Sequence, residues 1–194
     1  MKEETIKLCN RIWATRMSRI NAEKRLLNNE NFIQGLNIYY SLMTVIMSIF
    51  ALVWPSQLLN VLTLIMTVSL LVVILYFKSL RFPERAMEYR RIYAEMQKLE
   101  LKLKYSGDNE DTVKQVVDEY NELIKQGENQ ISFDYYKVLK ECDKEYRETH
   151  WRKTFGREYW KYIIMRFTIR SIAIVLPIIM FGIWLVSICG KISI

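Results

Sequence analysis

The chain contains few histidines, cysteines and glycines. It has a single histidine, His150, and three cysteines that are far apart and form no Cys-x-x-Cys pair. A structural zinc site needs about four His or Cys ligands at close spacing, and a disulfide framework needs paired cysteines, so the sequence predicts neither. Its six glycines form no glycine-rich phosphate-binding loop. We therefore expect a protein that is not an enzyme and that uses no cofactor.

Two long stretches also lack charge. Residues 31–77 contain no Asp, Glu, Lys, Arg or His, and neither do residues 171–190. A bilayer core about 30 Å thick requires about 20 apolar residues per helical crossing, so the first stretch can cross twice and the second once. As buried helices of a soluble domain they would need a large apolar partner core, and the rest of the chain is too charged to supply one. The sequence therefore predicts an all-α membrane protein with spans at residues 37–54, 58–77 and 171–189.

Prolines mark a turn and an expected kink in these spans. The segment from Ala51 to Asn60, ALVWPSQLLN, separates the first two spans. Pro55 disfavours helix at the residue before it, so Trp54 should end the first helix and the two spans should form a hairpin. Pro177 lies within the third span. We expect it to kink that helix, while neighbouring groups satisfy the carbonyl that it leaves without a donor.

The distribution of basic residues predicts the orientation. Lys24 and Arg25 precede the first span and further basic residues flank the central region, whereas the hairpin turn is uncharged and the C-terminal tail carries only Lys191. By the positive-inside rule, the N-terminus and the central region lie in the cytoplasm and the C-terminus lies outside. Basic residues beside a membrane are attracted to anionic lipid, and this role accounts for the net charge of +7. We therefore expect no direct DNA binding.

Residues 156–170 mix four basic residues with four aromatic ones directly before the third span. That composition is typical of a segment that lies at the membrane interface. Trp54 suits the headgroup region at the hairpin turn. The predicted contacts with the lipid interface are Trp54, Arg157, Trp160, Lys161, Arg166 and Arg170.

The remaining parts of the chain have helical periodicity. Residues 1–31 carry an apolar stripe that predicts an N-terminal cytoplasmic amphipathic helix. Residues 78–155 form a predicted cytoplasmic helical region, in which Asp111 and Ser132 are suitable caps for two later helices. The first helix of this region has an apolar seam typical of coiled coils, and we expect subunits or a partner to associate through it. The seam consists of Phe82, Tyr89, Ile92, Met96, Leu99 and Leu103.

Small polar residues share one face of each hairpin helix. They are Ser41, Thr44 and Ser48 in the first span and Asn60, Thr63 and Thr67 in the second. Two interpretations are open: these groups bond between packed helices, or they line a pore once several chains assemble. No Asp, Glu, Lys, Arg or His lies within the spans, which argues against a proton-coupled transporter.

Four segments around the hairpin resemble a known family. RMSRINAEKRLL at residues 16–27 leads into the hairpin, and PERAMEYRRIYAEMQKLELKL at 83–103, EYNELI at 119–124 and ENQISFDYYK at 128–137 follow it in that order. This arrangement resembles the SLATT domain, a small bacterial and archaeal module in which cytoplasmic helices flank two transmembrane helices. The likeness covers Met1 to about Arg147, and the third span departs from the two-helix pattern.

The resemblance implies a membrane effector of antiviral or other conflict systems. Such proteins accompany nucleotidyltransferases that make a nucleotide signal or, in some subfamilies, reverse transcriptases. We expect a homo-oligomer that permeabilises the inner membrane of a bacterium or archaeon on activation and so stops the infected cell. The alternative is a non-conducting membrane scaffold or sensor that tethers a cytoplasmic partner enzyme through its helical region. The expected partners are thus the lipid bilayer, further copies of the chain, and a nucleotide signal or a reverse transcriptase.

Overall fold

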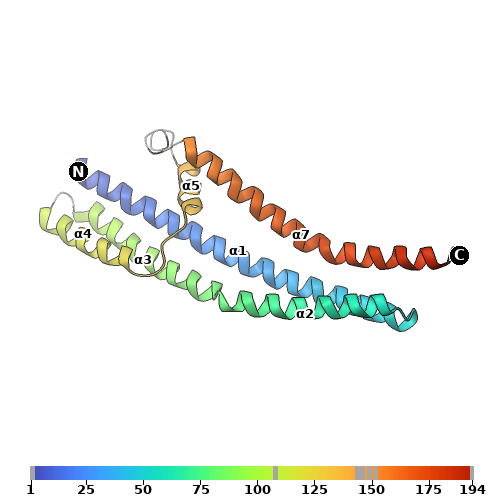
Figure 1. Ribbon diagram of the computed structural model, residues 1–194. Coiled ribbons are helices and arrows are strands. Elements are labelled where there is room, and N and C mark those ends of the chain that lie inside the picture. Colours follow the sequence, from blue (N-terminus) through green and yellow to red (C-terminus); the bar gives the residue numbers. More distant parts are fainter. Residues whose placement is uncertain (1–2, 107–108, 143–146, 148–149, 151–152, 193–194) are drawn as a thin grey trace. The chain divides into compact units, whose positions relative to one another are not determined.

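The computed structural model describes residues 3–106, 109–142, 147, 150 and 153–192. Its helices are α1 (Glu3–Val53), α2 (Gln57–Ser79), α3 (Phe82–Ser106), α4 (Glu110–Lys125), α5 (Ser132–Glu141) and α7 (Lys153–Ile192) (Figure 1). The described residues include no strand. Three helices are long and apolar enough to cross a membrane. The predicted all-α membrane fold is therefore confirmed.

The helices form two compact units. The first, which we call the head unit, comprises Met1–Asn28 and Phe82–Tyr162. The second, the span unit, comprises Asn29–Arg81 and Ile163–Ile194 and contains both charge-free stretches. Both α1 and α7 contribute residues to each unit. The division therefore separates the charged part of the chain from the apolar part.

Two helices are longer than the sequence analysis predicted. α1 continues without a break through the predicted boundary between the N-terminal helix at 1–31 and the first span at 37–54. Gly35 lies in that boundary, but one glycine costs a helix only about 1 kcal/mol and no proline is present to stop it. Likewise, α7 joins the predicted interfacial segment at 156–170 to the third span.

The hairpin turn forms where the proline predicts it. α1 ends at Val53, and α2 begins at Gln57. Ser56 is the N-cap of α2, and its side chain accepts a hydrogen bond from Leu59 N at 3.5 Å. The predicted helix stop at Trp54 is confirmed.

Two predicted caps lie elsewhere. The N-cap of α4 is Asn109, whose side chain accepts a 3.1 Å bond from Asp111 N, so Asp111 itself belongs to the first turn. The N-cap of α5 is Ile131, and the Asp134 carboxylate accepts its backbone N–H at 3.3 Å. In both cases a side-chain oxygen two or three residues away along the chain accepts a backbone N–H at the start of the helix.

The core of the head unit lies between α1, α3 and α4. It contains Cys9, Ile12, Ile92, Met96, Leu99, Leu103, Val116 and Tyr120, all at most 8% exposed. Burial of such a side chain stabilises a fold by about 1.5–3 kcal/mol. The core explains why the polar helices of this unit stay together.

The span unit buries much less of its apolar surface. Only 6% of the most apolar window of α1 is buried inside the chain, and the corresponding fraction is 11% in each of the other two candidate spans. Exposed apolar surface on this scale is unfavourable in water, so another apolar medium must cover it. A bilayer provides that medium, which accounts for the membrane character of the protein.

Candidate functional site

The polar stripe of the hairpin borders the packed core of the span unit. Ser41, Ser48, Asn60 and Thr67 are exposed, whereas Thr44 and Thr63 are half-buried. The chain's own helices therefore leave most of the stripe uncovered. In a membrane these residues must face lipid, a second protein chain or water.

Four hydroxyl groups of this stripe bond within their own helices. Thr44 Oγ1 donates to Tyr40 O and Ser48 Oγ donates to Thr44 O, both at 2.8 Å. Thr63 and Thr67 make the same 2.8 Å bonds in α2. Because these donors are satisfied, exposure to lipid costs little, while the oxygens can still accept a bond. Helix packing and pore lining therefore both stay predictions.

An aromatic cluster joins the three helices of the span unit. Trp184 of α7 is 1% exposed and packs with Met47 of α1 and with Leu59 and Met66 of α2. Its ring centroid lies 5.7 Å from that of Phe50 and 5.4 Å from that of Phe181. Aromatic pairs at such distances stabilise a fold by about 0.5–1.5 kcal/mol beyond their burial. The third span thus packs against both helices of the hairpin.

Two tyrosines of α1 bond to α7 next to its proline. Pro177 has no N–H, so the Ala173 carbonyl, four residues earlier, lacks its usual helical donor. Tyr40 Oη donates to Ala173 O at 2.8 Å, and Tyr39 Oη donates to Ile174 O at 3.0 Å. α7 bends in its C-terminal half (Figure 1). The prediction that a neighbouring group satisfies the freed carbonyl is confirmed.

Replacement Tyr40→Phe should therefore destabilise the span unit. It removes the donor to the part-buried Ala173 O, and a carbonyl left unsatisfied away from water costs about 1–3 kcal/mol. The matched control is Tyr39→Phe, which should lose less, because the residue four positions after Ile174 within α7 is not a proline and can donate its N–H. The measurement is unfolding of the full chain in detergent micelles by titration with sodium dodecyl sulfate. Equal losses in both variants would contradict this role of Tyr40.

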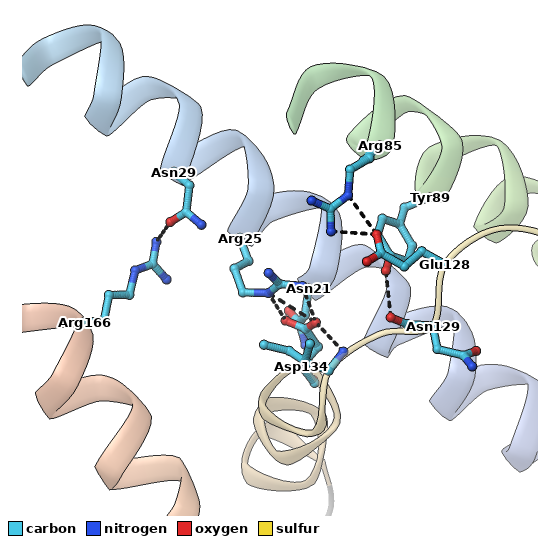
Figure 2. A network of polar contacts seen from close by, with 10 residues as sticks. Asn21, Arg25, Asn29, Arg85, Tyr89, Glu128, Asn129, Asp134 and Arg166 are labelled. Atoms are coloured by element: carbon cyan, nitrogen blue, oxygen red, sulfur yellow. Dashed lines mark hydrogen bonds and ion pairs between the residues drawn. The ribbon is translucent and has the colours of Figure 1, made fainter. Parts of the chain in front are cut away.

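A buried ion pair ties α5 to α1 in the head unit (Figure 2). Arg25 Nε lies 3.0 Å from Asp134 Oδ1, and Arg25 Nη2 lies 3.0 Å from Asp134 Oδ2. The Asp134 side chain is 0% exposed, and Asn21 Nδ2 donates to its backbone oxygen at 3.2 Å. Burial raises the pKa of the Asp134 carboxyl above its ordinary value, although the hydrogen bonds and charge of Arg25 oppose that rise. The bidentate geometry favours the ionised pair.

The same short helix contacts the beginning of α7 through aromatic rings. The Phe133 ring stacks on Tyr162, with centroids 4.2 Å apart, and on Tyr159, 5.1 Å apart. Lys140 Nζ lies 5.5 Å from the ring centroid of Trp160, a residue predicted from the sequence to lie at the lipid interface. Within the head unit, α5 therefore connects α1 to the helix that continues into the third span.

Further ion pairs join α1 to α3. Arg16 Nε lies 3.0 Å from Glu100 Oε2, and Arg90 Nη2 lies 2.6 Å from Glu23 Oε1. The Glu23 and Glu100 side chains are only 7% and 9% exposed. The sequence analysis missed these acids and Asp134, because each is one of many charges at helical spacing.

The predicted seam of α3 lies inside the chain. Its six residues, Phe82, Tyr89, Ile92, Met96, Leu99 and Leu103, are between 0% and 7% exposed. Four of them belong to the core shared with α1 and α4. A contact between subunits through this seam stays a prediction, and it would require α3 to leave its own core.

The predicted lipid-interface residues occupy two environments. Trp54, Arg157, Trp160 and Lys161 are exposed, and the Trp54 ring stacks on Phe50 with centroids 5.7 Å apart. Arg166 and Arg170 are half-buried and both donate to Asn29. In the part of the chain that the structure describes, no group of three His, Cys, Asp or Glu side chains could hold a metal ion.

Comparison with protein families identifies the chain's relatives. Residues 1–183 match the model of the SMODS and SLOG-associating 2TM effector domain family 5, or SLATT_5. The chain belongs to the SLATT family. No match was found among curated proteins or solved structures. The SLATT match extends past residue 147, where the resemblance in the sequence ended, and includes most of α7. Most of a third apolar helix therefore lies within the matched SLATT region, although the family description names two transmembrane segments.

Proposed function

We propose that this SLATT protein oligomerises and permeabilises the inner membrane of a bacterium or archaeon when a conflict system activates it. The observation that supports this proposal is the uncovered polar stripe on an otherwise apolar, largely exposed span unit. Three helices of one chain are too few to enclose water. Several copies that turn their stripes inward would form a weakly polar channel and would leave apolar residues toward lipid. The effector character of the family is consistent with this activity.

The head unit is suited to control such assembly. α5 holds α1 through Arg25–Asp134 and holds α7 through Phe133 and Tyr162, and both long helices continue into the span unit. A signal that loosens or tightens α5 would therefore act on two membrane helices. The signal, a nucleotide or a partner protein, must bind the two states with different affinity to shift their populations. The distribution of basic residues supports a cytoplasmic position for this unit, where a nucleotide signal or a partner protein could reach it.

Leakage from liposomes tests the proposal. The purified full-length chain is reconstituted in liposomes with an entrapped self-quenched dye, over a range of protein-to-lipid ratios, with and without a panel of cyclic mono- and dinucleotides. We expect leakage that rises steeply with the protein-to-lipid ratio and that one or more nucleotides increase. Liposomes that stay tight under all these conditions would overturn the pore and favour the non-conducting scaffold.

Variants of the polar stripe identify the surface responsible for leakage. The substitutions Thr44→Leu, Asn60→Leu and Thr67→Leu should together abolish most of the leakage, because they remove polar groups from the proposed channel wall. Matched apolar changes at exposed positions of the same helices, Val45→Leu, Val61→Leu and Val68→Leu, should preserve it. Equal leakage from the two triple variants would mean that the stripe does not face water.

A further inference from the structure

Arg19 of α1 is buried in the head unit without a full set of hydrogen-bond partners. The residue is 1% exposed. Its Nε and Nη1 atoms are buried and have no hydrogen-bond partner. Its Nη2 atom donates to Ile124 O on α4 at 3.5 Å, which is at the upper limit for a hydrogen bond. Buried donors in native proteins are nearly always satisfied, so this side chain requires an explanation.

Two other arginines of α1 show how the head unit holds a cation close to its core. Arg25 bonds to both carboxylate oxygens of Asp134, and Arg16 Nε lies 3.0 Å from Glu100 Oε2. Both arginines are half-buried, whereas Arg19 is buried. Of these three arginines, the most buried one therefore has the weakest bond, and its acceptor is a carbonyl instead of a carboxylate.

Burial of the Arg19 guanidinium is unfavourable for its charge. A cation that leaves water needs hydrogen bonds and opposite charges in place of the water. Burial accordingly lowers the pKa of Arg19, although the charge of Glu88 on α3 acts in the opposite direction. Ile124 lies in the last turn of α4, where carbonyls lack helical donors and the helix dipole favours a cation. These effects support the charge, but they leave Nε and Nη1 without acceptors.

α4 is the helix that supplies the one acceptor of Arg19, and its own polar attachments are modest. It packs against α3 (Figure 1). Tyr120 belongs to the head-unit core, and its hydroxyl group bonds to Thr15 at 2.8 Å. The ion pair between Lys102 on α3 and Glu119 on α4 joins side chains that are 35% and 42% exposed, and such pairs contribute little. By contrast, a buried ion pair holds α5 to α1.

We propose that α4 is the segment of the head unit that detaches most easily, and that Arg19, charged and incompletely bonded beside it, keeps its attachment weak. Detachment gives the guanidinium access to water, which offsets part of the lost apolar contact. The weak attachment is a property of the head unit alone. Its role in the control of assembly rests on the proposed function: a signal that binds the detached state more tightly shifts the head unit toward that state.

Hydrogen–deuterium exchange of the full chain in detergent micelles tests the weak attachment. In the wild type, the amides of α4 should exchange faster than those of α3 by about tenfold or more, because local opening precedes global unfolding. Arg19→Met keeps the length of the side chain but removes its charge, and it should slow exchange in α4 by about the same factor. The matched control is Arg16→Met, the same substitution on the same helix. It breaks the pair with Glu100 and should not slow exchange in α4.

Three results would overturn the weak attachment. The first is exchange in wild-type α4 as slow as in α3, a comparison that needs no variant. The second is faster exchange or a lower melting temperature in Arg19→Met, which would mean that the donors of Arg19 are satisfied in the folded protein, for example by buried water. The third is equal slowing by Arg16→Met, which would mean that removal of any positive charge from α1 stabilises the unit.

Leakage from liposomes separates this inference from the proposed pore. Where the wild type causes leakage, Arg19→Met should require a higher protein-to-lipid ratio for the same leakage, and Arg16→Met should not. Unchanged leakage in Arg19→Met despite slower exchange in α4 would overturn the role of α4 in assembly. Liposomes that never leak would overturn the pore, and the exchange experiment would still decide whether α4 detaches.

Discussion

Replacement of Asp134 by alanine should lower the free energy of unfolding of the full-length protein by about 3–5 kcal/mol, because it leaves a buried arginine without its partner. The Arg25 side chain is 11% exposed, and its Nε and Nη2 groups both bond to Asp134. The substitution also removes the acceptor for Ile131 N at the start of α5. Urea unfolding in detergent micelles, followed by far-ultraviolet circular dichroism, measures the loss.

Two further variants show whether burial is the cause of this loss. Glu128→Ala breaks the Arg85–Glu128 pair, in which Glu128 is 51% exposed, and should cost at most about 1 kcal/mol. The double variant Arg25→Met/Asp134→Leu replaces the buried charges by apolar groups and should recover most of the stability lost in Asp134→Ala. A loss in Asp134→Ala no larger than that in Glu128→Ala would contradict the importance of the buried pair.

The membrane part of the fold could be predicted because a bilayer imposes a simple rule on composition. Residues 31–77 and 171–190 lack charge over lengths that suit two spans and one span. Pro55 fixes the position of the turn, since the residue before a proline avoids helical geometry. Pro177 predicted that one carbonyl of its helix lacks a helical donor. That carbonyl belongs to Ala173, and its donor, Tyr40, lies 133 positions away from it along the chain. Such a pairing depends on how α1 and α7 pack and has no local signal.

The head unit could be predicted only in part. Its apolar periodicity predicted helices, but the same stripe can pack against a helix of its own chain or against another subunit. The structure packs Met96 and Leu103 of α3 against α1 and α4. Asp134 and Glu100 could not be distinguished from solvent-exposed acids, because their burial depends on Arg25 and Arg16 far away in the sequence. Residues that join distant segments were therefore the ones that sequence patterns missed.

The α3 seam can serve only the core of its own chain, or it can also form a contact between subunits. These two roles lead to different results for Leu103→Ala. Leu103 is 0% exposed in the head-unit core, and truncation of a buried leucine costs about 2–5 kcal/mol. Because the core lies within one chain, this loss should be the same at every protein concentration. The matched control is Leu101→Ala, on the same helix but 43% exposed, which should change the free energy of unfolding by at most about 0.5 kcal/mol.

Unfolding curves at several protein-to-detergent ratios, with the mass of the complex from light scattering, distinguish the two roles. For an intramolecular core, Leu103→Ala lowers stability equally at every ratio and leaves the mass unchanged. For a seam between subunits, the loss grows as the protein is diluted and the mass decreases, because folding is then linked to association. The second result would mean that α3 leaves its own core in the assembled protein, and contacts between subunits would then have to be sought in the head unit. The first would direct that search to the exposed faces of the span unit.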